Sequence, residues 1–392
     1  MKKGCLLIAI TVILILFMPC GFIANAASKE NKLENQIDKI LDKLDYKELE
    51  EFFNDLNENT KSTFGSNFKQ LLADILNGKS SLGSDKIASL VGAYLWNSLL
   101  GMLPLVITLI VIGTLYGLAS SMSSGFLKKS TIDIIYYVCL GAIIIVLITA
   151  INGIVTDVTA TIALLARFND IVFPLLLTLV TALGGLSAVG VYQPAIATIG
   201  MVIIKIITTI VMPLFLACVI FCIIGSLSNN IKLEKLTSTT KSTAEWILGI
   251  IFTLFIAFIT AEGIAGATFD TVTVRSAKFA ISSYVPIIGG HISDGFDLVV
   301  ASLILLKNSF GLISIIILIA IVLVPIIKIV IFSLLLKAAA AILEPIADKR
   351  VSDLLFNTAK CFNLLLIIII GLSFIIFVML ILIIVTCNLG VV

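Results

Sequence analysis

The sequence predicts an all-α, polytopic membrane protein. Of its 392 residues, 59% are hydrophobic and only 13% are charged, and the mean hydropathy is +1.18. Soluble domains average about 25% charged residues. Beyond about residue 90, apolar runs long enough to cross a bilayer as helices follow one another. The net charge of +2 does not favour a nucleic-acid partner, so membrane lipid is the expected surrounding.

The N-terminus has the pattern of a signal peptide over residues 1–26. Two lysines precede an apolar run, and Ala24, Asn25 and Ala26 then offer small residues where a signal peptidase cleaves. Because the run is almost long enough to span a bilayer, an uncleaved anchor is the alternative. In both cases, the chain that follows starts outside the cytoplasm.

Residues 27–90 are more polar than the rest of the chain, and their charged residues alternate with short apolar stripes at helical spacing. The stripes run from Leu33 to Leu44, from Leu49 to Leu56 and from Phe64 to Ile75. We expect a small extracytoplasmic helical domain. A docking surface for another extracytoplasmic protein is the alternative interpretation of the same stripes.

Residues 91–392 form the predicted transmembrane domain. Its clearest apolar runs lie near 94–119, 132–153, 203–227, 245–265, 311–335 and 361–387. Two weaker apolar segments, near 174–199 and 286–306, leave the number of spans between six and eight.

An internal repeat relates residues of about 147–265 to residues of about 258–387. Pro174 aligns with Pro286, and Pro213 aligns with Pro325, both at an offset of 112. A weaker third copy begins at Pro104. The repeat predicts three helical hairpins that are joined by two linkers, each about forty residues long.

The charges of the hairpin loops favour six crossings over eight. Cytoplasmic loops gather Lys and Arg, so all three loops are expected on the cytoplasmic side. Each linker must then begin and end outside, and its apolar segment must re-enter the membrane or lie at its surface. The basic residues are Lys128, Lys129, Lys232, Lys235, Lys241, Lys337, Lys349, Arg350 and Lys360.

The two Gly-rich linkers and two intramembrane lysines are the candidates for a pore or a subunit contact. Non-helical backbone at membrane depth requires protein or water to satisfy it, and a charge within a membrane segment is costly and often functional. Lys205 is near an end of its run and could snorkel, whereas Lys328 is central. The only histidine is expected to be solvated or to lie at a helix end. The candidates are Lys328, Lys205, Gly184, Gly185, Gly289, Gly290 and His291.

The sequence offers no pattern of an enzyme, a cofactor site or a metal site. It has no HExxH motif, phosphate loop or GxSxG elbow, and one histidine cannot build a multi-histidine metal site. Cys218 and Cys222 share a helix face, but the sequence shows no third ligand beside them, so we expect packed thiols.

Several strings resemble stage III sporulation protein AE, a family of endospore-forming bacteria. They are the stretch TVTVRSAKFAISSYVPIIGGHISDGFDLVV with its continuation ASLILLKNSFG, and the strings GGLSAVGVYQPA and KAAAAILEPIAD. The resemblance covers the chain from about residue 90 onward. It implies a mother-cell membrane protein at the engulfed forespore.

The resemblance also implies partners and a role. The partners would be other stage III sporulation A proteins, including an ATPase-like subunit, and stage II sporulation protein Q across the intermembrane space. Together they would form a secretion-like channel or its platform. A secondary transporter of a small solute and a purely structural membrane anchor are the alternatives.

Overall fold

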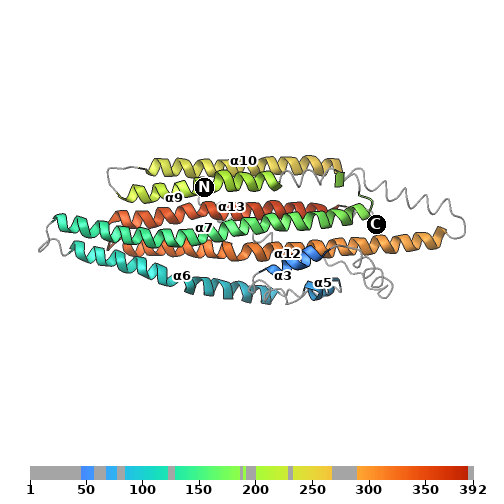
Figure 1. Ribbon diagram of the computed structural model, residues 1–392, viewed down its shortest axis with the longest axis horizontal. Helices are drawn as coiled ribbons and strands as arrows, with labels where there is room; N and C mark the ends of the chain where they lie inside the picture. Colours follow the sequence, from blue (N-terminus) through green and yellow to red (C-terminus); the bar gives the residue numbers. More distant parts are fainter. Residues whose placement is uncertain are drawn as a thin grey trace.

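The protein is an elongated bundle of long helices (Figure 1). The computed structural model describes residues 46–56, 68–76, 84–121, 129–185, 189–190, 200–227, 233–266 and 289–386, and within these ranges every regular element is a helix. The predicted all-α class is therefore confirmed. The predicted signal peptide lies outside the described residues.

The elements keep their labels from Figure 1. They are α3 (Lys47–Asp55), α5 (Phe68–Leu76), α6 (Ser84–Ser121), α7 (Lys129–Ala182), the π-helix η3 (Ile207–Val211), α9 (Met212–Leu227), α10 (Glu234–Gly266), α12 (Gly289–Leu343) and α13 (Lys349–Val385).

Six helices in the described part of the chain are long and apolar enough to cross a membrane. These spans are Val91–Ala119, Ile134–Ala182, Gly200–Leu227, Glu234–Thr260, Val299–Leu343 and Lys349–Val385. The number agrees with the smaller of the two expected values, and the protein is polytopic.

The two weaker apolar segments do not form additional crossings or re-entrant loops where they are described. Residues 174–182 are the end of α7, and residues 289–306 are the start of α12. The described parts of both segments therefore continue long helices, and Pro174 lies inside α7 without ending it. With 54 and 55 residues, α7 and α12 are each about 80 Å long at 1.5 Å per residue. Both therefore extend well beyond the roughly 30 Å hydrocarbon core of a bilayer.

The three predicted hairpins are present as α6–α7, α9–α10 and α12–α13, and the helix ends that flank the three turns lie at the same end of the bundle (Figure 1). The hydroxyl of Tyr136 in α7 donates to the carbonyl of Ser226 in α9 at 3.1 Å. The guanidinium carbon of Arg350 in α13 lies 3.7 Å from the centroid of the Tyr136 ring. These contacts show that the start of α7, the end of α9 and the start of α13 meet at one end of the bundle.

The hairpin α12–α13 occupies the centre of the bundle. Most residues in the apolar windows of these two helices are buried, whereas few residues in the windows of α6 and α10 are. Apolar side chains such as Trp96 and Leu254 cover the outer surfaces of α6 and α10. A helix that is apolar on all sides is typical of a buried or lipid-facing position, so this arrangement fits a membrane bundle.

Helices α3 and α5 pack on the long helices. The Phe52 and Phe168 ring centroids are 6.0 Å apart, as are those of Tyr46 and Phe310. Arg167 also approaches Asp55 to 3.4 Å. Because the apolar side chains of α3 are buried where this helix packs on α7 and α5, this stripe is not free to dock another protein.

The turn between α12 and α13 touches α6 so closely that only glycine fits. A Cβ atom on Gly117 would lie 2.2 Å from the backbone oxygen of Ile346, whereas a Cβ atom on Gly141 in α7 would meet nothing within 4 Å. The contact with Gly117 therefore joins the first hairpin to the third.

We expect Gly117→Ala to lower the free energy of unfolding by about 2 kcal/mol, because the added methyl group overpacks this contact. Gly141→Ala is the matched control and should be neutral or slightly stabilising, since alanine favours helix over glycine. Thermal unfolding of the purified protein in detergent checks both. Equal melting temperatures for the two variants would contradict the close approach.

Candidate functional site

Lys328 in α12 forms an ion pair with Asp157 in α7. The Lys328 Nζ lies 2.8 Å from the Asp157 Oδ2, and the two side chains are 38% and 46% exposed. The residues beside Lys328 are apolar and buried, since Ile327 and Ile329 are 6% and 0% exposed. The predicted intramembrane lysine therefore has a partner of opposite charge.

The pair lies far from the ends of both helices. Asp157 is 28 residues from the start of α7 and Lys328 is 15 residues from the end of α12, which corresponds to roughly 42 and 22 Å along the axes. Both residues belong to candidate membrane spans. A charge within a membrane segment is costly, so mutual neutralisation is a reason for the pairing.

The outer face of α7 changes character beside this pair. Before residue 150 its exposed side chains are mainly apolar, including Ile134, Val138, Ile145 and Ile148. Farther along, Asn152, Thr156 and Thr159 are exposed. We call Asn152, Thr156, Asp157 and Thr159 the polar strip of α7.

The threonines of the polar strip satisfy their own hydroxyl groups. Thr156 and Thr159 donate to the carbonyls of Asn152 and Val155, at 2.9 and 2.8 Å. Asn152 is exposed, and the ion pair beside it is only half-buried. The strip therefore suits water or a polar protein partner better than lipid chains.

Lys205 lies apart from this pair. It is exposed on the helical segment that begins at Gly200, and within the described residues it forms no ion pair. Its exposure is consistent with snorkelling to the interface.

Gly184 and Gly185 end α7. Gly184 has a φ of 88°, and the amides of Gly184 and Gly185 donate to the carbonyls of Thr181 and Val180 at 2.9 and 3.0 Å. This is the Schellman pattern, in which glycine adopts the left-handed conformation that closes a helix. The double glycine therefore has a structural role at this position.

Gly289, Gly290 and His291 are the first three residues of α12. The surroundings of the His291 side chain lie outside the described residues. Lys328 follows His291 by 37 residues, or about 55 Å along the helix. The predicted candidates therefore do not form one site.

The sequence analysis did not identify Asp157 as the partner of Lys328. It also did not identify Cys361 as a neighbour of Cys218 and Cys222. Asp157 follows an apolar run in a segment rich in threonine, which the sequence analysis assigned to a linker. The structure shows that this segment continues the helix α7. The Cys361 sulfur of α13 lies 2.9 Å from that of Cys218 and 3.6 Å from that of Cys222.

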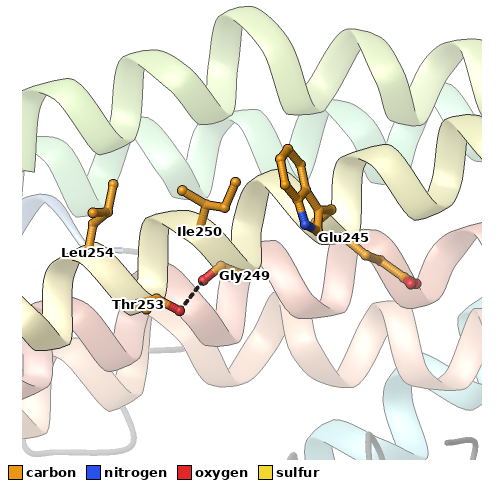
Figure 2. Close-up of a pocket in the computed structure, with 6 residues that line it drawn as sticks. Glu245, Gly249, Ile250, Thr253 and Leu254 are labelled. Atoms are coloured by element: carbon orange, nitrogen blue, oxygen red, sulfur yellow. Dashed lines mark hydrogen bonds between the residues drawn. The ribbon is translucent and has the colours of Figure 1, made fainter.

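A shallow hollow of about 460 Å³ lies along α10 (Figure 2). Its lining comes from this one helix: Glu245, Trp246, Gly249, Ile250, Thr253 and Leu254. The Thr253 hydroxyl donates to the Gly249 carbonyl at 2.8 Å, which leaves the hollow without a free polar group at that point. A surface of this kind is typical of helix packing in membranes and offers no chemistry.

The fold defines a polytopic α-helical membrane protein, in which an ion pair joins two of the long helices, α7 and α12. The family model of stage III sporulation protein AE matches residues 66–387, and the chain belongs to this family. It is 26% identical over 303 residues to the stage III sporulation protein AE of Bacillus subtilis (strain 168), which covers 77% of this chain and 76% of the relative. No solved structure matches the chain.

Family membership supports a role in sporulation. Among the described residues no group of His, Cys, Asp and Glu side chains could hold a metal ion.

Lys328→Met should destabilise the protein by about 2 kcal/mol, because it leaves Asp157 without its partner in a region where a lone charge is costly. The double variant Lys328→Met with Asp157→Asn removes both charges and should melt close to the wild type.

Lys205→Met is the matched control, since it removes an exposed lysine that has no ion pair in the described structure. Melting temperatures in detergent give the comparison. If Lys328→Met and Lys205→Met proved equally harmless, the coupling between α7 and α12 through this pair would be refuted.

Proposed function

We propose that the protein is a membrane subunit of the stage III A sporulation assembly and forms part of a secretion-like channel, or of its platform, between mother cell and forespore. Its place would be the mother-cell membrane around the forespore. Its partners would be the other stage III sporulation A proteins, including an ATPase-like subunit, and stage II sporulation protein Q across the intermembrane space. Family membership and the multi-pass helical fold support this proposal.

The proposed orientation places the three basic turns in the mother-cell cytoplasm. Lys235, Lys349 and Arg350 lie at or near the first turns of α10 and α13, and cytoplasmic segments are rich in such residues. The docking point of α3 at Phe168 is 32 residues along α7 from Tyr136, or about 48 Å. This separation is close to the 40–45 Å of a whole bilayer, so α3 and α5 would face the intermembrane space.

The half-exposed ion pair and the polar strip of α7 are the observations that carry the proposal. A protein that was surrounded by lipid alone would expose Asp157, Lys328 and Asn152 to hydrocarbon or headgroups at a cost. A subunit of a larger assembly can cover this surface with another protein or keep it in water. The polar strip and the ion pair are therefore the surface that we propose contacts a partner protein or water.

A secondary transporter is the second candidate, and the same ion pair favours it. Transporters bind substrates and coupling ions near the bilayer midplane, between repeated units, and Asp157 and Lys328 lie on helices from two different hairpins. Solute uptake by liposomes containing only this protein would support the transporter. Activity only in the presence of the other assembly members would support the channel subunit.

A labelling experiment tests the orientation. Thr239→Cys, at an exposed position near the start of α10, is introduced into a chain whose native cysteines are replaced. A membrane-impermeant maleimide should react with it only after the cells are opened. The protein is expressed in cells that are not sporulating, so that its outer side faces the medium, and Glu51→Cys on α3 is the control that should react in the intact cells. Reaction of Thr239→Cys in intact cells would show that the middle turn faces outward.

Sporulation of a strain that carries only the double variant Asp157→Asn with Lys328→Met tests the surface formed by the polar strip and the ion pair. We expect the frequency of spores to fall, because a partner that contacts this surface loses both charges. Lys205→Met should sporulate normally. If the double variant is folded and also sporulates normally, the charges of the strip have no role in the assembly.

A further inference from the structure

Three thiols meet in the interior of the bundle. Cys218 and Cys222 lie one turn apart on α9, and Cys361 lies on α13. The side chains are 1%, 9% and 2% exposed, and all three are free thiols. Because α9 and α13 belong to different hairpins, the sequence alone could not bring these cysteines together.

The sulfurs are close enough for a covalent bond to form with a small movement. The Sγ atoms of Cys218 and Cys361 are 2.9 Å apart, compared with about 2.05 Å in a disulfide. The Cys222 sulfur is 3.6 Å from that of Cys361. Cys361 can therefore pair with either cysteine of α9, but with only one at a time.

The backbone just before the two cysteines of α9 is irregular. Residues Ile207–Val211 form a π-helix, and Pro213 follows, which has no N–H to donate to the preceding turn. The wider π turn accommodates this proline, and such segments recur at functional sites. This irregularity gives the cysteine-bearing part of α9 freedom to rotate slightly relative to α13.

We propose that Cys218 and Cys361 form a reversible disulfide, with Cys222 as the resolving thiol. Formation removes two protons and two electrons from the two thiols, and a small-molecule or protein disulfide accepts them and becomes two thiols. The Cys222 thiolate then attacks the Cys361 sulfur, the bond between Cys361 and Cys218 breaks, and Cys218 leaves as a thiolate. A metal site is not favoured, because no group of ligands among the described residues could hold an ion.

The bond would join the middle hairpin to the centre of the bundle. It would close a covalent loop between residues 143 positions apart, and α9 could then no longer shift against α13. This inference concerns the oxidation state of the bundle and does not depend on the proposed role in the sporulation assembly.

Counting free thiols tests the proposal. Membranes that contain the full-length protein are treated with oxidised glutathione, denatured, and reacted with a maleimide that carries a polyethylene glycol chain. The wild type should gain two fewer chains than a reduced sample while remaining a monomer on a gel. Cys361→Ser should gain equal numbers of chains with and without oxidation.

Matched variants separate the roles of the three thiols. Cys222→Ser and Cys139→Ser should lose two reactive thiols as the wild type does, since Cys139 lies on α7 outside the cluster. Cys218→Ser should also lose two, through the bond between Cys222 and Cys361, whereas the double variant of Cys218 and Cys222 should lose none. Unchanged thiol numbers in the oxidised wild type, or a loss of two in Cys361→Ser, would overturn the proposal.

Discussion

The antiparallel packing of α12 on α13 is the contact on which the rest of the bundle depends. Both helices are apolar on nearly all sides and mostly buried, and serine hydroxyls join them. Ser333 donates to the carbonyl of Ala359 at 3.0 Å, and Ser352 donates to that of Ala340 at 2.9 Å. Hydrogen bonds of this kind between helices help hold membrane bundles together where burial from water contributes little. The other two hairpins then pack around this central pair.

Two of the three lysines of α12, Lys307 and Lys328, interact with their surroundings in different ways. Lys307 is fully buried and donates to the carbonyl of Thr386, at the end of α13. The C-terminal end of a helix carries partial negative charge, so this lysine fixes where the central pair ends. Lys328 is instead half-exposed and paired with Asp157. The first arrangement completes the fold, whereas the second leaves a charged surface that further partners or water can reach.

Predictions from the sequence succeeded where a local pattern has one physical solution. An uninterrupted apolar run must be a helix, because the bilayer core offers no water to satisfy the backbone. The repeat and the basic turns predicted three hairpins with their ends on one side, and the contacts of Tyr136 with Ser226 and Arg350 confirm this. The Gly-rich linkers were harder to interpret. Gly184 and Gly185 were candidates for a pore or a subunit contact, but in the structure their amides bond to the carbonyls at the end of α7.

The sequence by itself determined the class of protein, its six clearest apolar runs and the pairing of neighbouring helices into hairpins, since these depend on residues close together in the chain. Only the tertiary structure decided which distant residues meet. Asp157 and Lys328 are 171 positions apart, and Cys218 and Cys361 are 143 apart. Such contacts depend on how the hairpins rotate and slide against one another, and hydropathy does not encode that rotation when most faces of a helix are apolar.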